Sequence, residues 1–95
     1  MNSEEQPGIT FAGFIISLAT TAAVHFGDIE DPATVERMAP NLSAAHQMID
    51  LIALLQDKTR GNLTADEAKL VDDLLYELRM RFVQAQQGGR RIHEP

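Results

Sequence analysis

Hydrophobic and polar residues recur with helical spacing in three segments of this chain, and the first of them has no charged side. Residues 10–26, TFAGFIISLATTAAVHF, contain no Asp, Glu, Lys or Arg. Thr10 fits an N-cap, and Gly27 stands where a left-handed residue would end the helix. The pattern therefore predicts a first helix from Phe11 to Phe26.

Two different faces follow when the residues of this helix are placed at intervals of about 100°. One is an apolar arc of about 200°, twice the width of an ordinary surface helix: Phe11, Ala12, Phe14, Ile15, Ile16, Leu18, Ala19, Ala22, Ala23 and Phe26. The other, which we call the small face, consists of Gly13, Ser17, Thr20, Thr21 and Val24. Small residues let a second helix approach closely. We expect the apolar arc to form the core and the small face to contact a second copy or a partner protein.

Caps and amphipathic patterns predict two further helices. The second begins at Asn41 or Ser43 and ends near Thr59. The third begins after a capping box of Thr64 and Glu67 and runs to Gln87, where two glycines are expected to break it. Because only residues 60–63 separate these helices, we expect an antiparallel hairpin.

The segment between the first and second helices shows no alternation typical of a strand. Asp31-Pro32 fits an N-cap followed by a first-turn proline, which predicts a short turn of helix. The fold class is therefore an all-α, three-helix bundle, completed by oligomerisation. Its single domain spans residues 10–87, between a disordered acidic leader (1–9) and a flexible tail (88–95).

A second apolar line lies on the polar side of the third helix. Tyr76, Met80 and Val83 are spaced i, i+4 and i+7 among charged residues, as in a rimmed contact patch. Scattered exposed apolar residues are also normal on monomers. The line is thus a predicted interface, and the alternative is that these are scattered apolar residues that stay exposed on a monomer.

Composition narrows the classes of partner. A chain of 95 residues buries only about 60 to 65% of its unfolded surface, so association would help to stabilise it. The formal net charge of −6 repels nucleic acid and anionic lipid. There is no cysteine, and the first eight residues are acidic rather than basic as in a secretory signal. We expect a cytoplasmic protein that neither binds nucleic acid nor spans a membrane.

Candidate chemistry is sparse. His25 lies near the end of the first helix, where we expect a hydrogen-bonded structural histidine, although a pH-sensitive one is conceivable. His46 and Asp50 have the i, i+4 spacing of an exposed pair, or of an oriented ligand or base. No Ser-His-acid series, phosphate-binding glycine loop or HExxH motif occurs. We therefore assign no catalytic, cofactor-binding or metal-binding residue.

A polar turn joins the second and third helices: Lys58, Thr59, Arg60, Gly61, Asn62 and Thr64. Its cations could hold an anion, but cations at a helix C-terminus also complement the helix dipole, and we favour that role. The run KTRGNLT, with Leu54-Leu55 before it and LYELR at 75–79 after it, resembles the bacterial family known as domain of unknown function 1844. The resemblance extends to Thr10-Phe11, His25 and Gly27. The resemblance implies a small cytosolic helical protein and carries over no functional residue.

Three functions remain open at this point. The first is a non-enzymatic interaction or oligomerisation module that uses the small face and the line of Tyr76, Met80 and Val83. The second is a small-molecule binder with an apolar cavity between the first and second helices, bordered by His25. The third is attachment to a membrane surface through the first helix.

Overall fold

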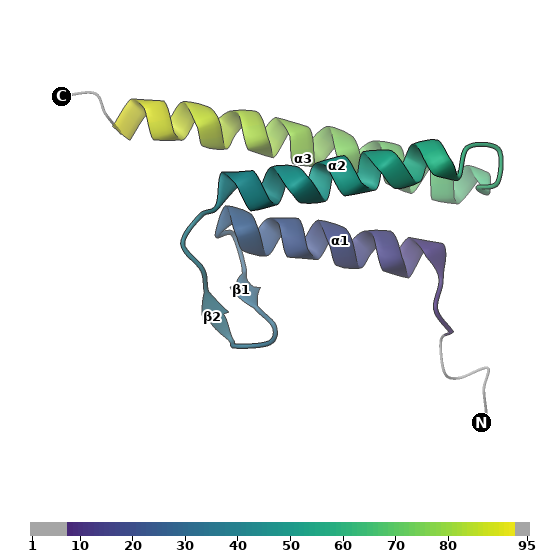
Figure 1. Ribbon diagram of the computed structural model, residues 1–95, viewed down its shortest axis with the longest axis horizontal. Coiled ribbons are helices and arrows are strands. Elements are labelled where there is room, and N and C mark those ends of the chain that lie inside the picture. The colour runs from purple at the N-terminus through teal and green to yellow at the C-terminus, as the bar shows by residue number, and fades with distance from the viewer. Residues whose placement is uncertain (1–7, 93–95) are drawn as a thin grey trace.

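Three helices lie side by side in the computed structural model, which describes residues 8–92 (Figure 1). They are α1 (Phe11–Phe26), α2 (Leu42–Lys58) and α3 (Ala65–Ile92). A two-stranded hairpin of β1 (Glu30–Asp31) and β2 (Glu36–Arg37) lies between α1 and α2 in the chain. The predicted three-helix architecture is confirmed, with α2 and α3 as an antiparallel pair (Figure 1).

The three helices begin at predicted caps, and α1 ends at the predicted glycine. The Thr10 hydroxyl accepts a hydrogen bond from the Gly13 amide at 2.9 Å, and Gly27 ends α1 with φ 82°. The Thr64 amide donates to the Glu67 carboxylate at 2.9 Å, while the Glu67 amide donates to the Thr64 hydroxyl at 3.1 Å. This reciprocal pair is the predicted capping box.

The core is the seam where all three helices meet. One fully buried β-branched residue comes from each helix: Ile15 from α1, Ile52 from α2 and Val71 from α3. Around them pack Ala22, Phe26, Ala45, Ile49, Leu75 and Leu78. Because each helix gives its apolar stripe to the same cluster, α1 contacts both other helices and the bundle has one core.

The expected helical turn after α1 is wrong, since residues 30–37 form an antiparallel hairpin with Glu30 opposite Arg37. Asp31 organises its turn. Its Oδ1 accepts from the Ala33 amide at 2.9 Å, and its carbonyl accepts from the Val35 amide at 2.7 Å. Asp31 therefore caps a tight turn instead of a helix, and Val35 takes a left-handed φ of 58° to reverse the chain.

The predicted end of the third helix at Gln87 is also wrong. Helix α3 continues through both glycines to Ile92. Glycine in a helix costs only about 1 kcal/mol, and a Cβ added at Gly88 would meet no atom within 4 Å, so no neighbouring segment crowds the helix there. The predicted leader (1–9) falls largely on residues 1–7, which lie outside the described residues. Of the predicted tail (88–95), residues 88–92 belong to α3, and residues 93–95 lie outside the described residues.

An ion pair fastens the start of the hairpin segment to α3. Arg81 donates from Nε and Nη2 to the two carboxylate oxygens of Asp28, at 2.8 and 2.7 Å. The guanidinium also lies over the Phe26 ring, with Cζ 5.1 Å from the ring centroid. Hydrogen bonding to Arg81 lowers the pKa of Asp28, against a smaller opposing effect of desolvation.

The stability contributed by this pair is expected to depend on pH. Because the folded-state pKa of Asp28 is lowered, the contribution is present above the unfolded pKa of about 3.9 and is lost as the pH falls through the folded pKa. We expect Asp28→Asn to lower the free energy of unfolding by about 1 kcal/mol or less at pH 7, since the pair is partly exposed. Urea titrations at pH 7, 5 and 3 should show the deficit shrinking with acid.

A control for that experiment is Asp73→Asn, which removes the same charge from an exposed pair within α3. Asp73 accepts from Lys69 at 2.8 Å, one turn earlier in the same helix. Its loss should change stability less than Asp28→Asn does. A deficit for Asp28→Asn that stays constant from pH 7 to pH 3 would contradict the assigned pKa direction.

Candidate functional site

The outward side of α1 has two large apolar residues at its edges. Phe14 and Ile16 are 46% and 48% exposed, so their predicted place in the core is wrong. They stand about 160° apart around the helix, one at each end of the arc that α2 and α3 cover. An arc of about 200° was too wide for two neighbours to bury.

The hairpin covers the C-terminal part of the small face. Val24 is only 5% exposed and Thr20 is partly buried, which corrects the prediction that both are available for contact. The physical reason is the chain reversal at Gly27, after which β1 packs back against α1. Gly13, Ser17 and Thr21 are exposed, and their contact with a second copy or a partner protein stays a prediction.

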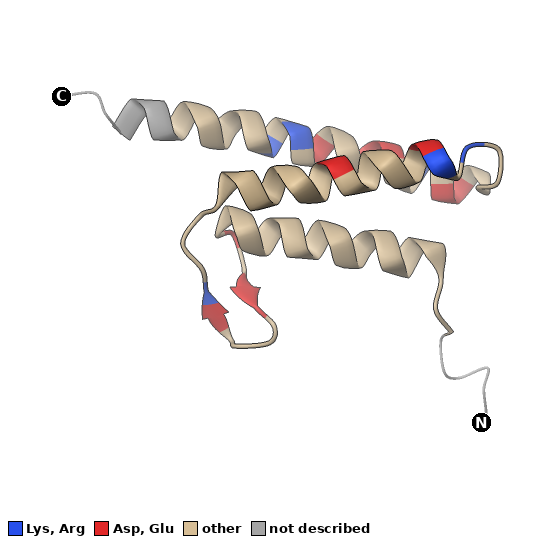
Figure 2. Ribbon diagram, viewed as in Figure 1, with Lys and Arg blue, Asp and Glu red and all other residues tan. Residues whose placement is uncertain are grey.

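We call the remaining surface the open face of α1. Its members share exposure and lack of charge: Gly13, Phe14, Ile16, Ser17 and Thr21. Figure 2 shows that α1 carries no Lys, Arg, Asp or Glu, while charged residues mark α2, α3 and the hairpin.

The hydroxyl groups of the open face are already hydrogen-bonded within the helix. Ser17 donates to the Phe14 carbonyl at 2.6 Å and Thr21 to the Ser17 carbonyl at 3.0 Å. Covering these hydroxyls therefore leaves no donor without a partner. Burying the open face against a partner therefore costs little free energy for the desolvation of polar groups.

The line on α3 lies at the surface, as predicted. Tyr76, Met80 and Val83 are 67%, 46% and 44% exposed. Charged neighbours such as Glu77 and Arg79 are exposed beside them. The line is thus accessible, and its role as an interface stays a prediction.

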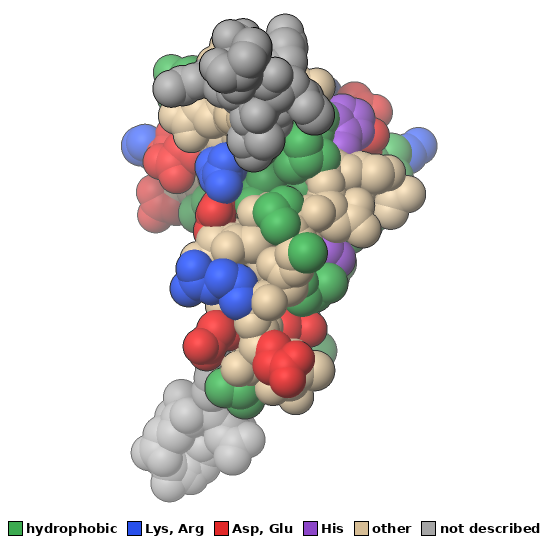
Figure 3. Space-filling model, turned by 90° about the vertical axis from the view of Figure 1, so that its left-hand side faces the viewer, with side chains coloured by type: hydrophobic (Ala, Val, Ile, Leu, Met, Phe, Trp, Pro, Cys, Tyr) green, Lys and Arg blue, Asp and Glu red, His purple; other side chains and the backbone are tan. Residues whose placement is uncertain are grey.

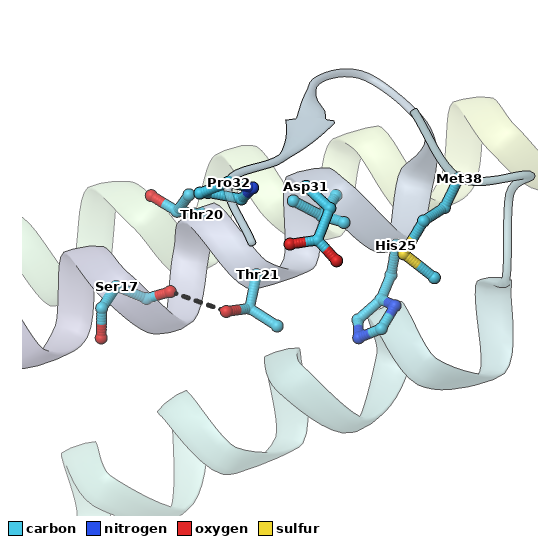
Figure 4. A pocket seen from close by; sticks show the side chains of 8 residues that line it. Ser17, Thr20, Thr21, His25, Asp31, Pro32 and Met38 are labelled. Carbon is cyan, nitrogen blue, oxygen red and sulfur yellow. Dashed lines mark hydrogen bonds between the residues drawn. The ribbon is translucent and has the colours of Figure 1, made fainter. Parts of the chain in front are cut away.

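A pocket of about 380 Å³ lies between α1 and the hairpin segment. It is lined by Ser17, Thr20, Thr21, Val24, His25, Asp31, Pro32 and Met38. In Figure 4 the Asp31 carboxylate is directed from the hairpin toward Thr21 and His25 of α1. The cavity predicted beside His25 was expected between the first and second helices, whereas none of the residues that line this pocket comes from α2.

The two helical histidines differ in their surroundings. His25 is partly buried, and its Nδ1 is enclosed without a hydrogen-bond partner among the described residues, so the expected hydrogen bond is missing at that atom. His46 forms the predicted pair, with Nδ1 3.1 Å from Oδ2 of Asp50, and both side chains are exposed. The His46 ring also packs on Phe82 of α3, with ring centroids 5.1 Å apart.

The polar turn serves chain reversal. The Thr59 hydroxyl donates to the Leu55 carbonyl at 2.7 Å, and Arg60 contacts Asp57 at 3.4 Å. Gly61 has φ 88°, and the Asn62 amide donates to the Thr59 carbonyl at 2.8 Å. Lys58 is exposed at the end of α2, in keeping with a cation that complements the helix dipole.

Figure 3 views the hairpin end of the bundle, where hydrophobic side chains lie between acidic and basic ones and histidine is visible at the surface. Within residues 8–92, side chains that could ligate a metal do not gather in groups of three or more. Over the same range, each helix is too short or too polar to cross a membrane.

Comparisons with known proteins give a family and nothing closer. Searches for similar curated proteins and for similar solved structures found no match. A family model, described as a domain of unknown function (DUF1844), matches residues 8–84, which include all of α1 and α2, the hairpin and most of α3. The chain therefore belongs to the DUF1844 family of domains of unknown function.

Proposed function

We propose that this chain is a non-enzymatic interaction module that associates with a second copy of itself through the open face of α1. The observation that carries the proposal is the pair of half-exposed side chains, Phe14 and Ile16, on either side of Gly13 and Ser17. Large apolar residues at the edges with small residues between them leave room for a second helix at close approach.

The absence of charge on the open face favours it over the other surfaces as the contact between two copies. Two copies with a net charge of −6 repel each other on average, and contact is least opposed where neither copy presents a charge. Helix α1 meets this condition along its whole length. The acidic balance also supports a protein partner over nucleic acid or anionic lipid. A chain without cysteine suits the cytoplasm, which is the location we propose.

The size of the face sets the expected strength. A helix of 16 residues is about 24 Å long, so a single pair of helices buries less than the roughly 800 Å² per partner of a standard interface. We therefore expect a concentration-dependent dimer with a dissociation constant in the micromolar range or weaker.

The test is the dependence of mass on concentration. Sedimentation equilibrium of the unchanged protein should show a monomer–dimer transition, and the double variant Phe14→Lys/Ile16→Lys should remain monomeric up to about tenfold higher concentration or more. Both positions are exposed, so the helical circular dichroism should be unchanged.

The matched control places two lysines on the line of Tyr76, Met80 and Val83. Exposed charged residues such as Glu77 and Arg79 surround this line, so we leave it out of the proposed dimer contact. Tyr76→Lys/Met80→Lys adds the same charge on α3 and should leave the dimer intact. A folded monomer at millimolar concentration would overturn the proposal. So would a dimer that the α3 variant abolishes and the α1 variant does not.

A further inference from the structure

The pocket between α1 and the hairpin combines three walls of different chemistry. Thr20 and Thr21 come from α1, Asp31 from the hairpin, and Met38 from the segment that leads to α2. The volume of about 380 Å³ exceeds the roughly 30 Å³ share of one water molecule many times, so a small organic molecule fits.

The threonine hydroxyl groups of this pocket can accept a hydrogen bond from a ligand. They cannot donate one without breaking a hydrogen bond within α1. Thr20 donates its hydroxyl hydrogen to the Ile16 carbonyl at 3.0 Å, and Thr21 donates to Ser17 at 3.0 Å. Their oxygen lone pairs remain available. A ligand that brings donors therefore suits these groups better than one that brings acceptors.

The charge of the lining points the same way. Asp31 is the charged residue of the pocket, and its lining contains neither Lys nor Arg. One carboxylate oxygen accepts from the Ala33 amide, which uses only part of the capacity of about four lone-pair sites. An anion would meet this carboxylate without a compensating cation, whereas a cation would gain a charge-assisted hydrogen bond.

The rest of the lining suits a short hydrocarbon. Val24, Pro32 and Met38 contribute apolar surface, and the methionine side chain can adapt to an irregular ligand. The His25 ring adds a further wall whose Nδ1 has no hydrogen-bond partner among the described residues. Figure 4 shows the Asp31 carboxylate, the Met38 side chain and the His25 ring around the same pocket.

From these observations we infer that the pocket binds a small primary alkylammonium ion, with its nitrogen at the Asp31 carboxylate and the threonine hydroxyls and its alkyl chain against Val24, Pro32 and Met38. The pocket shares Ser17 and Thr21 with the open face of α1, whereas Asp31, Pro32 and Met38 lie outside that face. Binding is therefore tested at low protein concentration, where the chain is monomeric.

The test is a titration of the full chain with n-butylammonium chloride, followed by amide chemical shifts. Saturable changes are expected at Thr20, Thr21, Val24 and Ala33, with a dissociation constant in the millimolar range. Sodium chloride at equal ionic strength, and sodium butyrate as the anion of similar length, should not reproduce them. Equal shifts with sodium chloride or with butyrate would overturn the inference.

Two variants separate the pocket from the general acidity of the hairpin. Asp31→Asn removes the charge but keeps an oxygen that can accept from Ala33, so the turn is retained, and affinity should fall about tenfold. Glu36→Gln removes the same charge from the residue that pairs with Asp31 across the hairpin, outside the pocket lining, and should leave affinity within about twofold. Equal losses in both variants would show general electrostatic attraction and refute the site. An unchanged affinity in Asp31→Asn would refute it too.

Discussion

Replacing Ile52 with alanine is expected to lower the free energy of unfolding by about 3 kcal/mol, within the range of about 2 to 5 for buried isoleucine. Ile52 is fully buried in the cluster to which Ile15 of α1 and Val71 of α3 also belong. The cavity left by alanine would therefore open at the one place where all three helices meet. Urea unfolding followed by helical circular dichroism measures the change.

Leu54→Ala is the control on the same helix, because Leu54 is 51% exposed. It removes a similar number of atoms but leaves no enclosed cavity, so its cost should be below about 1 kcal/mol. Equal losses for the two variants would contradict the single core described above. The comparison matters because a domain of this size has only about 5 to 15 kcal/mol of stability. Association through α1 requires that this helix stays packed against α2 and α3.

The starts of the three helices and the ends of the first two could be predicted because their determinants are local. Thr10, Asn41 and Thr64 each accept from an amide three residues later, within the reach of a sequence motif. Gly27 and Gly61 both adopt positive φ after a helix, as their positions indicated. Such features depend on a few neighbouring residues, which the sequence shows directly.

The corrections concern contacts between segments far apart in the sequence. Val24 is buried only because the hairpin folds back over α1, and a helical wheel of residues 11–26 holds no information about that segment. Phe14 and Ile16 were assigned to the core because they are apolar, yet they lie at the edges of an arc that two helices cannot cover. The hydrophobicity of a residue alone does not show whether a neighbouring helix covers it.

Some of the residues that line the pocket could be predicted from the sequence, but the position of the pocket could not. His25 was recognised as a possible cavity border, and the small face supplies Thr20 and Thr21. The missing piece was Asp31, whose side chain was expected to cap a helix and instead closes a turn. An Asp followed by Pro permits either outcome, since an Asx turn and an N-cap use the same oxygen. The tertiary position of the hairpin decides which of them forms.

Replacing Gly27 with alanine is expected to cost about 2 kcal/mol and to disturb the hairpin end of the molecule. A left-handed φ of 82° costs a non-glycine residue about 1 kcal/mol or more. In addition, the new Cβ would lie 3.2 Å from the Met38 carbonyl oxygen and 3.3 Å from Cγ of Pro40, closer than side chains normally pack. Urea unfolding measures the cost, and the amide shifts of Met38, Ala39 and Asn41 report the displacement.

Gly61→Ala separates these two effects, because Gly61 has a similar φ of 88° but open space within 4 Å of its expected Cβ. Its cost should therefore be the backbone strain alone, about 1 kcal/mol. If the two substitutions were equally destabilising, the close packing of the Gly27 turn on residues 38–40 would be refuted. Because Met38 also lines the pocket, Gly27→Ala should weaken butylammonium binding while Gly61→Ala leaves it unchanged, so the pair tests whether the turn that ends α1 also shapes the pocket.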